Sequence, residues 1–188
     1  MKKGLILIIA VMTVVCISIS ATLAYLFVET DPVENTFEYG DINITLDESE
    51  NLNLKMIPGS NITKDPKVTV LKDSEACWLF VEINKSANFD NFMSYEIADG
   101  WTQGNGTDIP ANVYYREVPA TEADTKFEVL KGNLVSVKDT VTKDMFNALT
   151  DGTKPTLTFK AYAVQKENVN SAADAWKLVG TKGLPVNP

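Results

Sequence analysis

Hydrophobic and polar residues alternate along most of the chain from Phe37 onward, so the apolar period is two rather than 3.6. Ile42, Ile44 and Leu46 fall on one face of a predicted strand, and the polar residues between them fall on the other. Turn residues separate similar runs, as at Pro58-Gly59. Roughly eight to ten short strands at ~8–12-residue spacing favour a jelly-roll-like β-sandwich. Further strands are predicted near 52–56, 68–71, 76–83, 95–101, 113–118, 127–137 and 157–164, with loops at 84–91 and 103–110.

The predicted strand at 76–83 differs from the others because it is apolar on both faces. Cys77, Leu79, Val81 and Ile83 share one face, and Trp78 and Phe80 lie on the other. Such a run is typical of a central strand that is covered on both sides. The alternative is that its outer face contacts a partner protein.

Two segments break the β pattern and predict short helices. Residues 142–149 carry apolar side chains at Met145, Phe146 and Leu149, which share a helical face. Residues 171–179 follow Ser171, an N-cap residue, with an acidic residue three positions later, and Gly180 is predicted to end this helix. The fold class is therefore all-β, with one or two short helices.

The N-terminus has the three parts of a secretory signal: Lys2 and Lys3, an apolar run, and small residues that end at Ala24. We predict cleavage between Ala24 and Tyr25. The alternative is a retained membrane anchor, which needs about 20 apolar residues, and the run to Phe27 nearly qualifies. The predicted organisation is a signal peptide at 1–24, an N-terminal extension at 25–37 and a β-sandwich domain at 38–188.

Charge narrows the range of partners. The 188 residues carry a formal charge of −8, and loss of Lys2 and Lys3 with the signal makes it −10. Phosphate backbones and anionic lipid would repel such a chain. We therefore expect a secreted protein that binds no nucleic acid and contacts the membrane only transiently, through its signal.

The sequence contains no histidine, which excludes Ser-His-Asp and Cys-His catalysis and HExxH zinc sites. Cys16 lies in the signal, so Cys77 is left alone, and we expect it to be a buried, inert thiol. The acidic clusters contain no D-x-[DN]-x-[DN]-G loop and are interpreted as a solvated face rather than a Ca²⁺ site. No catalytic residue, cofactor site or metal site is predicted. The acidic clusters mentioned above are Asp47-Glu48 with Glu50, and Asp139 with Asp144.

Several short sequences of the first third resemble one family of Gram-positive bacteria, the TasA, CalY and camelysin group. They are Thr22-Leu23-Ala24-Tyr25-Leu26-Phe27, Asn35-Thr36-Phe37, Gly40-Asp41-Ile42, Pro58-Gly59 and Ile62-Thr63-Lys64-Asp65. The resemblance implies a jelly-roll domain, exported by Sec and a SipW-type signal peptidase. It also implies self-assembly into extracellular biofilm fibres, in which the N-terminal segment of one subunit completes the sheet of the next.

The residues after the predicted cleavage site are the candidate assembly segment. Exposed apolar side chains there are unfavourable, since burying one is worth roughly 1.5–3 kcal/mol. Addition of this segment to an open sheet edge of a neighbour would bury them and produce filaments. The alternative is that the segment forms the first strand of its own domain. The residues of this candidate assembly segment are Tyr25, Leu26, Phe27, Val28, Val33 and Phe37.

Three functions remain open at this stage. The first is a non-enzymatic structural subunit of matrix fibres. The second is a cell-surface metallopeptidase, as camelysin is described, although this chain lacks histidine. The third is a monomeric surface-binding or adhesion domain, in which the aromatic residues Trp78, Phe80 and Trp101 would form a partner surface rather than core.

Overall fold

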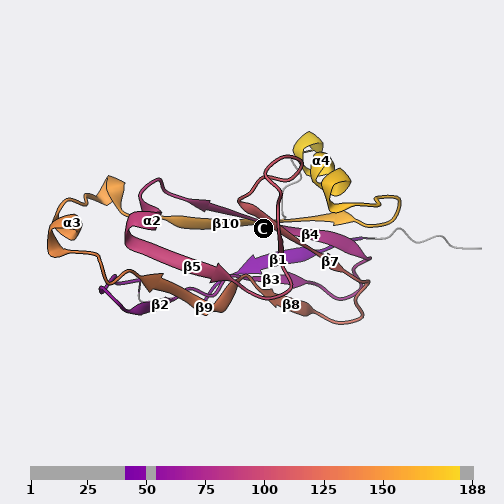
Figure 1. Cartoon of the computed structure of the whole chain (residues 1–188). Coiled ribbons are helices and arrows are strands. Elements are labelled where there is room, and N and C mark those ends of the chain that lie inside the picture. The colour runs from indigo at the N-terminus through magenta and orange to yellow at the C-terminus, as the bar shows by residue number, and fades with distance from the viewer. Residues whose placement is uncertain (1–40, 50–53, 183–188) are drawn as a thin grey trace, which may run out of the picture. The chain divides into compact units, whose positions relative to one another are not determined.

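The computed structural model describes residues 41–49 and 54–182, in which most of the regular secondary structure is β-strand (Figure 1). All strand pairs among them are antiparallel. The strands are β1 (Ile44–Asp47), β2 (Asn61–Thr63), β3 (Lys67–Val70), β4 (Cys77–Lys85), β5 (Met93–Ile97), β6 (Thr102–Gln103), β7 (Val113–Val118), β8 (Thr125–Glu128), β9 (Leu130–Val137) and β10 (Leu157–Gln165).

The strands form three sheets. Their orders are β1-β3-β8, β2-β9-β5 and β10-β4-β7-β6. The Lys64 N–H donates to the Asn133 carbonyl (2.8 Å), which extends the β2–β9 pair, and the Val129 N–H donates to the Pro66 carbonyl (3.1 Å), which extends the β3–β8 pair. Through these bonds the two three-stranded sheets adjoin each other. The all-β prediction is therefore confirmed.

One apolar core joins the three sheets, as alternation predicts. Val68 and Val70 of β3 are fully buried, and Ile42, Ile44 and Leu46 pack against the same core from the β1 segment. The β4 face formed by Cys77, Leu79, Val81 and Ile83 belongs to this core. Each such side chain contributes roughly 1.5–3 kcal/mol when it is buried.

The opposite face of β4 is also covered, which confirms the first of the two interpretations of its sequence. Phe80 is fully buried in a second cluster with Ala172 and Ala175 of α4 (Ala172–Lys182). The Trp176 ring of α4 lies 5.3 Å from the Phe80 ring and 5.7 Å from the Tyr162 ring, measured between centroids. The helix thus packs on the outer face of the β4–β10 pair (Figure 1).

Both predicted helices exist, and a hydroxyl caps the start of each; the Ser171 cap is the one that the sequence predicts. The Ser171 hydroxyl accepts a hydrogen bond from the Asp174 backbone (3.1 Å). Thr142 does the same for Met145 (3.3 Å) at the start of α3 (Lys143–Asn147). The prediction that Gly180 ends the last helix is wrong, because α4 continues to Lys182. A glycine costs a helix only about 1 kcal/mol, which packing of the preceding turns offsets.

Other predictions also need correction. The strand predicted at 95–101 ends at Ile97, before β6 begins, and the run predicted at 127–137 is divided between β8 and β9. Residues 54–57 form no strand, because side-chain alternation alone does not supply the neighbouring strand that a ladder needs. The predicted loop at 84–91 contains the end of β4 and the start of a single-turn helix, α2 (Phe89–Phe92), which buries Phe89 and Phe92. With α2, the described part of the chain holds three α-helices rather than one or two.

The predicted signal peptide, its cleavage between Ala24 and Tyr25, and the extension at 25–37 lie outside the described residues. These three stay predictions. Within 41–49 and 54–182, no helix combines the length and the apolar character that crossing a membrane requires.

Candidate binding cleft

An apolar cleft of about 420 Å³ lies where β2, β9 and the start of β10 come together. We call it the cleft. Its walls come from six separate stretches of sequence, so only the tertiary structure assembles it. The lining residues are Leu54, Met56, Ile62, Lys64, Phe89, Met93, Val135, Lys154, Pro155, Thr156, Leu157 and Thr158.

The floor of the cleft is part of the main core. Ile62 of β2 and Val135 of β9 are register partners, and both are almost fully buried. Phe89 and Met93 add buried side chains from α2 and β5. This floor is rigid because its residues are held by strand pairing on one side and by core packing on the other.

The first rim of the cleft is held by two polar contacts. The Lys64 ammonium contacts the Glu48 carboxylate at 2.6 Å and lies 5.7 Å from the centre of the Phe159 ring. The buried Asp65 carboxylate accepts hydrogen bonds from Ser49 Oγ (2.6 Å) and from the Ser49 backbone (3.0 Å). These Ser49 bonds, together with Lys67, hold the pKa of Asp65 below its usual value.

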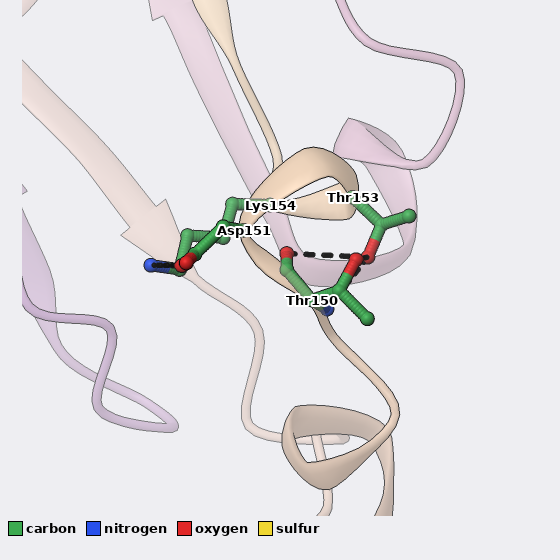
Figure 2. Close-up of polar contacts among 4 residues, drawn as sticks. All are labelled: Thr150, Asp151, Thr153 and Lys154. Atoms are coloured by element: carbon green, nitrogen blue, oxygen red, sulfur yellow. Dashed lines mark hydrogen bonds and ion pairs between the residues drawn. The ribbon is translucent and has the colours of Figure 1, made fainter.

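The second rim is a tight turn, η1 (Asp151–Thr153), that leads directly into the cleft-lining residues 154–158 (Figure 2). The Thr153 hydroxyl accepts a hydrogen bond from the Thr150 backbone at 2.8 Å. Figure 2 also shows the ion pair between Lys154 Nζ and Asp151 (2.7 Å). This ion pair lowers the pKa of Asp151.

The chemistry of the lining favours apolar ligands. Two lysines lie at the rims, and each contacts a carboxylate of its own chain, so the cleft offers little net charge. Leu54, at the lip, is 56% exposed and is one of the most exposed large apolar side chains that the structure describes. Apolar surface of this kind is typical of a site that binds apolar side chains.

A different arrangement lies across the core, where β7 and β8 approach. The Arg116 guanidinium packs 4.1 Å from the centre of the Phe127 ring and 5.4 Å from that of the Trp101 ring. We call this group the Trp101–Arg116–Phe127 stack. The indole of Trp101 donates to the Glu128 carbonyl (2.8 Å), so it bridges the two sheets. Burial lowers the pKa of Arg116.

The structure places the other predicted residues in packing roles. Cys77 is fully buried, as expected, and burial raises the pKa of its thiol to about 11. Phe80 is core, whereas Trp78 and Trp101 are half-buried and pack against the two apolar clusters. Within the described residues, no three acidic or thiol side chains gather in a group that would hold a metal ion.

The candidate assembly residues at 25–37 lie outside the described part of the chain, so the structure does not bring them to any site. Sequence reasoning missed the cleft because its walls are far apart in the chain. It also missed Arg116, although a signal existed: this is the only arginine in a sequence with 17 basic residues.

Comparisons of the chain with protein-family models, with curated proteins and with solved structures found no match.

Proposed function

We propose that this chain is a secreted structural subunit of extracellular matrix fibres, exported by Sec and a SipW-type signal peptidase. In this proposal each subunit accepts the N-terminal segment of a neighbour in its cleft. The observation that carries the proposal is an apolar cleft that lies beside two sheet-edge strands.

The edge strands supply the backbone groups that an added strand needs. β2 and β10 are each the end strand of their sheet, and each pairs on one side only with another described strand. Both contribute side chains to the cleft, through Ile62 and Leu157. A peptide that pairs with either edge would direct alternate side chains inward, because successive strand residues point to opposite faces.

The size of the cleft suits this occupant. An apolar cavity of about 150 Å³ holds one benzene molecule, and this cleft measures about 420 Å³. The predicted segment carries consecutive apolar residues from Tyr25 to Val28. Burying two of them would contribute roughly 3–6 kcal/mol before the loss of chain entropy is subtracted.

We further propose that the fold is a jelly roll. Consecutive strands pass from one sheet to another: β3, β4 and β5 belong to three different sheets. β9 and β10 also belong to different sheets. Repeated crossing between layers is characteristic of Greek-key and jelly-roll sandwiches.

Deletion of residues 25–34 tests the assembly proposal. We expect the truncated protein to keep its cooperative unfolding transition but to form no fibres in negative-stain electron microscopy. A truncated protein that unfolds as a monomer, or that still forms fibres, contradicts strand donation. Full-length protein that stays monomeric at all concentrations favours the adhesion-domain alternative.

A point variant in the cleft tests the acceptor side. Leu54→Asp places a charge at the lip and should prevent fibre formation without unfolding the subunit, because Leu54 is 56% exposed. The matched control is Leu178→Asp on α4, where the side chain is 45% exposed and lies away from the cleft lining. Loss of fibres in both variants, or in neither, contradicts a role for the cleft.

Export is tested separately. N-terminal sequencing of protein from the culture medium should begin at or near Tyr25. Protein that retains Met1 and is found only in membranes would instead support an anchor.

The proposal also holds that the protein does not hydrolyse peptides. Purified protein should leave casein intact with or without added Zn²⁺. Cleavage that disappears when an acidic pair is mutated would overturn this part of the proposal.

A further inference from the structure

Arg116 is a charged side chain that its own fold leaves without an acceptor. No hydrogen bond or ion pair joins its guanidinium to any residue of 41–49 or 54–182, and its Nε atom is buried without a partner. Several lysines, such as Lys64 and Lys85, contact carboxylates at 2.6 Å. An unpaired, partly desolvated cation is unfavourable, so its retention calls for a ligand.

We propose that the Trp101–Arg116–Phe127 stack is an anion-binding site that takes a carboxylate group. The two rings lie 4.1 Å and 5.4 Å from the guanidinium carbon, measured to the ring centres, and restrict the position of the side chain, which favours bidentate carboxylate binding. Because Nε is enclosed, the carboxylate meets the guanidinium end-on, at the two Nη groups.

Gly100 lies close to these Nη groups. Its backbone has a φ of +85°, and a Cβ added there would lie 3.0 Å from one Nη atom of Arg116. Any other residue would therefore press against the guanidinium and be strained in its backbone. The glycine thus serves both the turn before β6 and the close packing of that turn on Arg116.

The presence of arginine rather than lysine at position 116 supports recognition of a planar carboxylate, and not only attraction by charge. The other 16 basic residues of the sequence are lysines, which supply a compact charge without a planar fork. Acidic residues adjoin the site in sequence, with Asp99 next to Gly100 and Glu128 next to Phe127. Negative charge on these same two segments favours a monoanionic carboxylate over a dianionic phosphate.

Because Arg116 is the only arginine, nitrogen-15 labelling of the full chain gives one Nε–Hε signal for it. We expect a saturable shift of this signal and of the Gly100 amide during titration with sodium acetate. Sodium chloride at equal ionic strength should give a smaller, non-saturating shift. Absence of saturation, or equal shifts with both salts, overturns the proposal, and this measurement on the unaltered protein needs no variant.

Arg116→Lys is the matched variant, since it keeps the charge and removes the fork. It should abolish the saturable shift at Gly100 while the amide signals of the core strands stay in place. A saturable Gly100 shift that survives in this variant contradicts bidentate recognition.

The carboxylate belongs either to a second copy of the chain or to a separate ligand, and sedimentation distinguishes these two sources. Self-association that weakens at least tenfold in acetate and in Arg116→Lys assigns the carboxylate to a second copy of the chain. Acetate binding without such an effect assigns it to a separate carboxylate-bearing ligand. This proposal is independent of fibre assembly, because deletion of residues 25–34 should leave acetate binding unchanged.

Discussion

Two places in this protein where different sheets meet differ in how they are filled. At one, Trp101, Arg116 and Phe127 stack on each other, and an indole hydrogen bond joins the sheets. At the other, β2 and β10 border a cleft of about 420 Å³ with an apolar floor. The comparison shows that side chains stacked between two sheets fill one junction, whereas the other junction leaves apolar surface accessible in a cleft.

The difference begins at the end of β1. This strand covers the β3 edge as far as Asp47, and the chain is then held at Ser49 by the buried Asp65. Residues 54–57 continue toward the Pro58-Gly59 turn without forming a strand, so the β2 edge lacks the cover that β3 has among the described residues. Five predictions test this comparison.

Trp101→Ala should have the largest effect on stability. It removes the indole hydrogen bond to Glu128 and one ring of the stack, and large aromatic truncations in packed sites cost about 3 kcal/mol. We expect the free energy of unfolding in urea to fall by that amount. A loss below about 1 kcal/mol would show that the stack does not close this side.

Asp65→Ala should destabilise the cleft side by about 2 kcal/mol, because it removes the acceptor of two Ser49 hydrogen bonds. Asp47→Ala is the control, since the exposed Asp47 carboxylate accepts from Thr45 alone and should change stability by less than about 0.5 kcal/mol. Equal losses in the two variants would contradict a special role for Asp65.

The effect of Asp65 should also depend on pH. Its pKa is lowered in the folded state, chiefly by Ser49, so its contribution is present above the unfolded pKa of about 4 and is lost as pH falls through the folded pKa. The difference in unfolding free energy between wild type and Asp65→Ala should therefore shrink below about pH 4. A constant difference down to about pH 2 would rule this out.

Substitution of Arg116 should have a smaller effect. Arg116→Met loses the ring contacts, worth about 0.5–2 kcal/mol, but also removes the buried, unpaired Nε–H, which costs about 1–3 kcal/mol. We expect this variant to unfold within about 1 kcal/mol of wild type, as measured in urea. A loss above about 2 kcal/mol would show that Arg116 is retained for stability and would weaken the case for a ligand.

Leu54→Ala should have the smallest effect, below about 0.5 kcal/mol, because more than half of the side chain is exposed at the cleft lip. Thermal unfolding of monomeric protein measures this directly. A clear drop in stability would mean that the lip is packed, and the cleft would then be less accessible than the structure indicates.

The sequence by itself determined the fold class, most of the longer strands and most of the core. Alternation identified the faces of β1 and β10, and the two-sided apolar run identified β4 as the covered central strand. The spacing of Met145, Phe146 and Leu149 identified α3, and the Ser171 cap identified the start of α4. These features are local, since they follow from the period of a strand or from donors in the first turn of a helix.

Only the tertiary structure decided the cleft and the stack. The cleft joins residues from Leu54 to Thr158, and the stack joins Trp101, Arg116 and Phe127 from three separate segments. Alternation shows which side chains face inward, but it does not show which strand edges have neighbours or how far apart two sheets lie. The absence of a strand at 54–57 has the same cause, because a strand exists only where a partner supplies its hydrogen bonds.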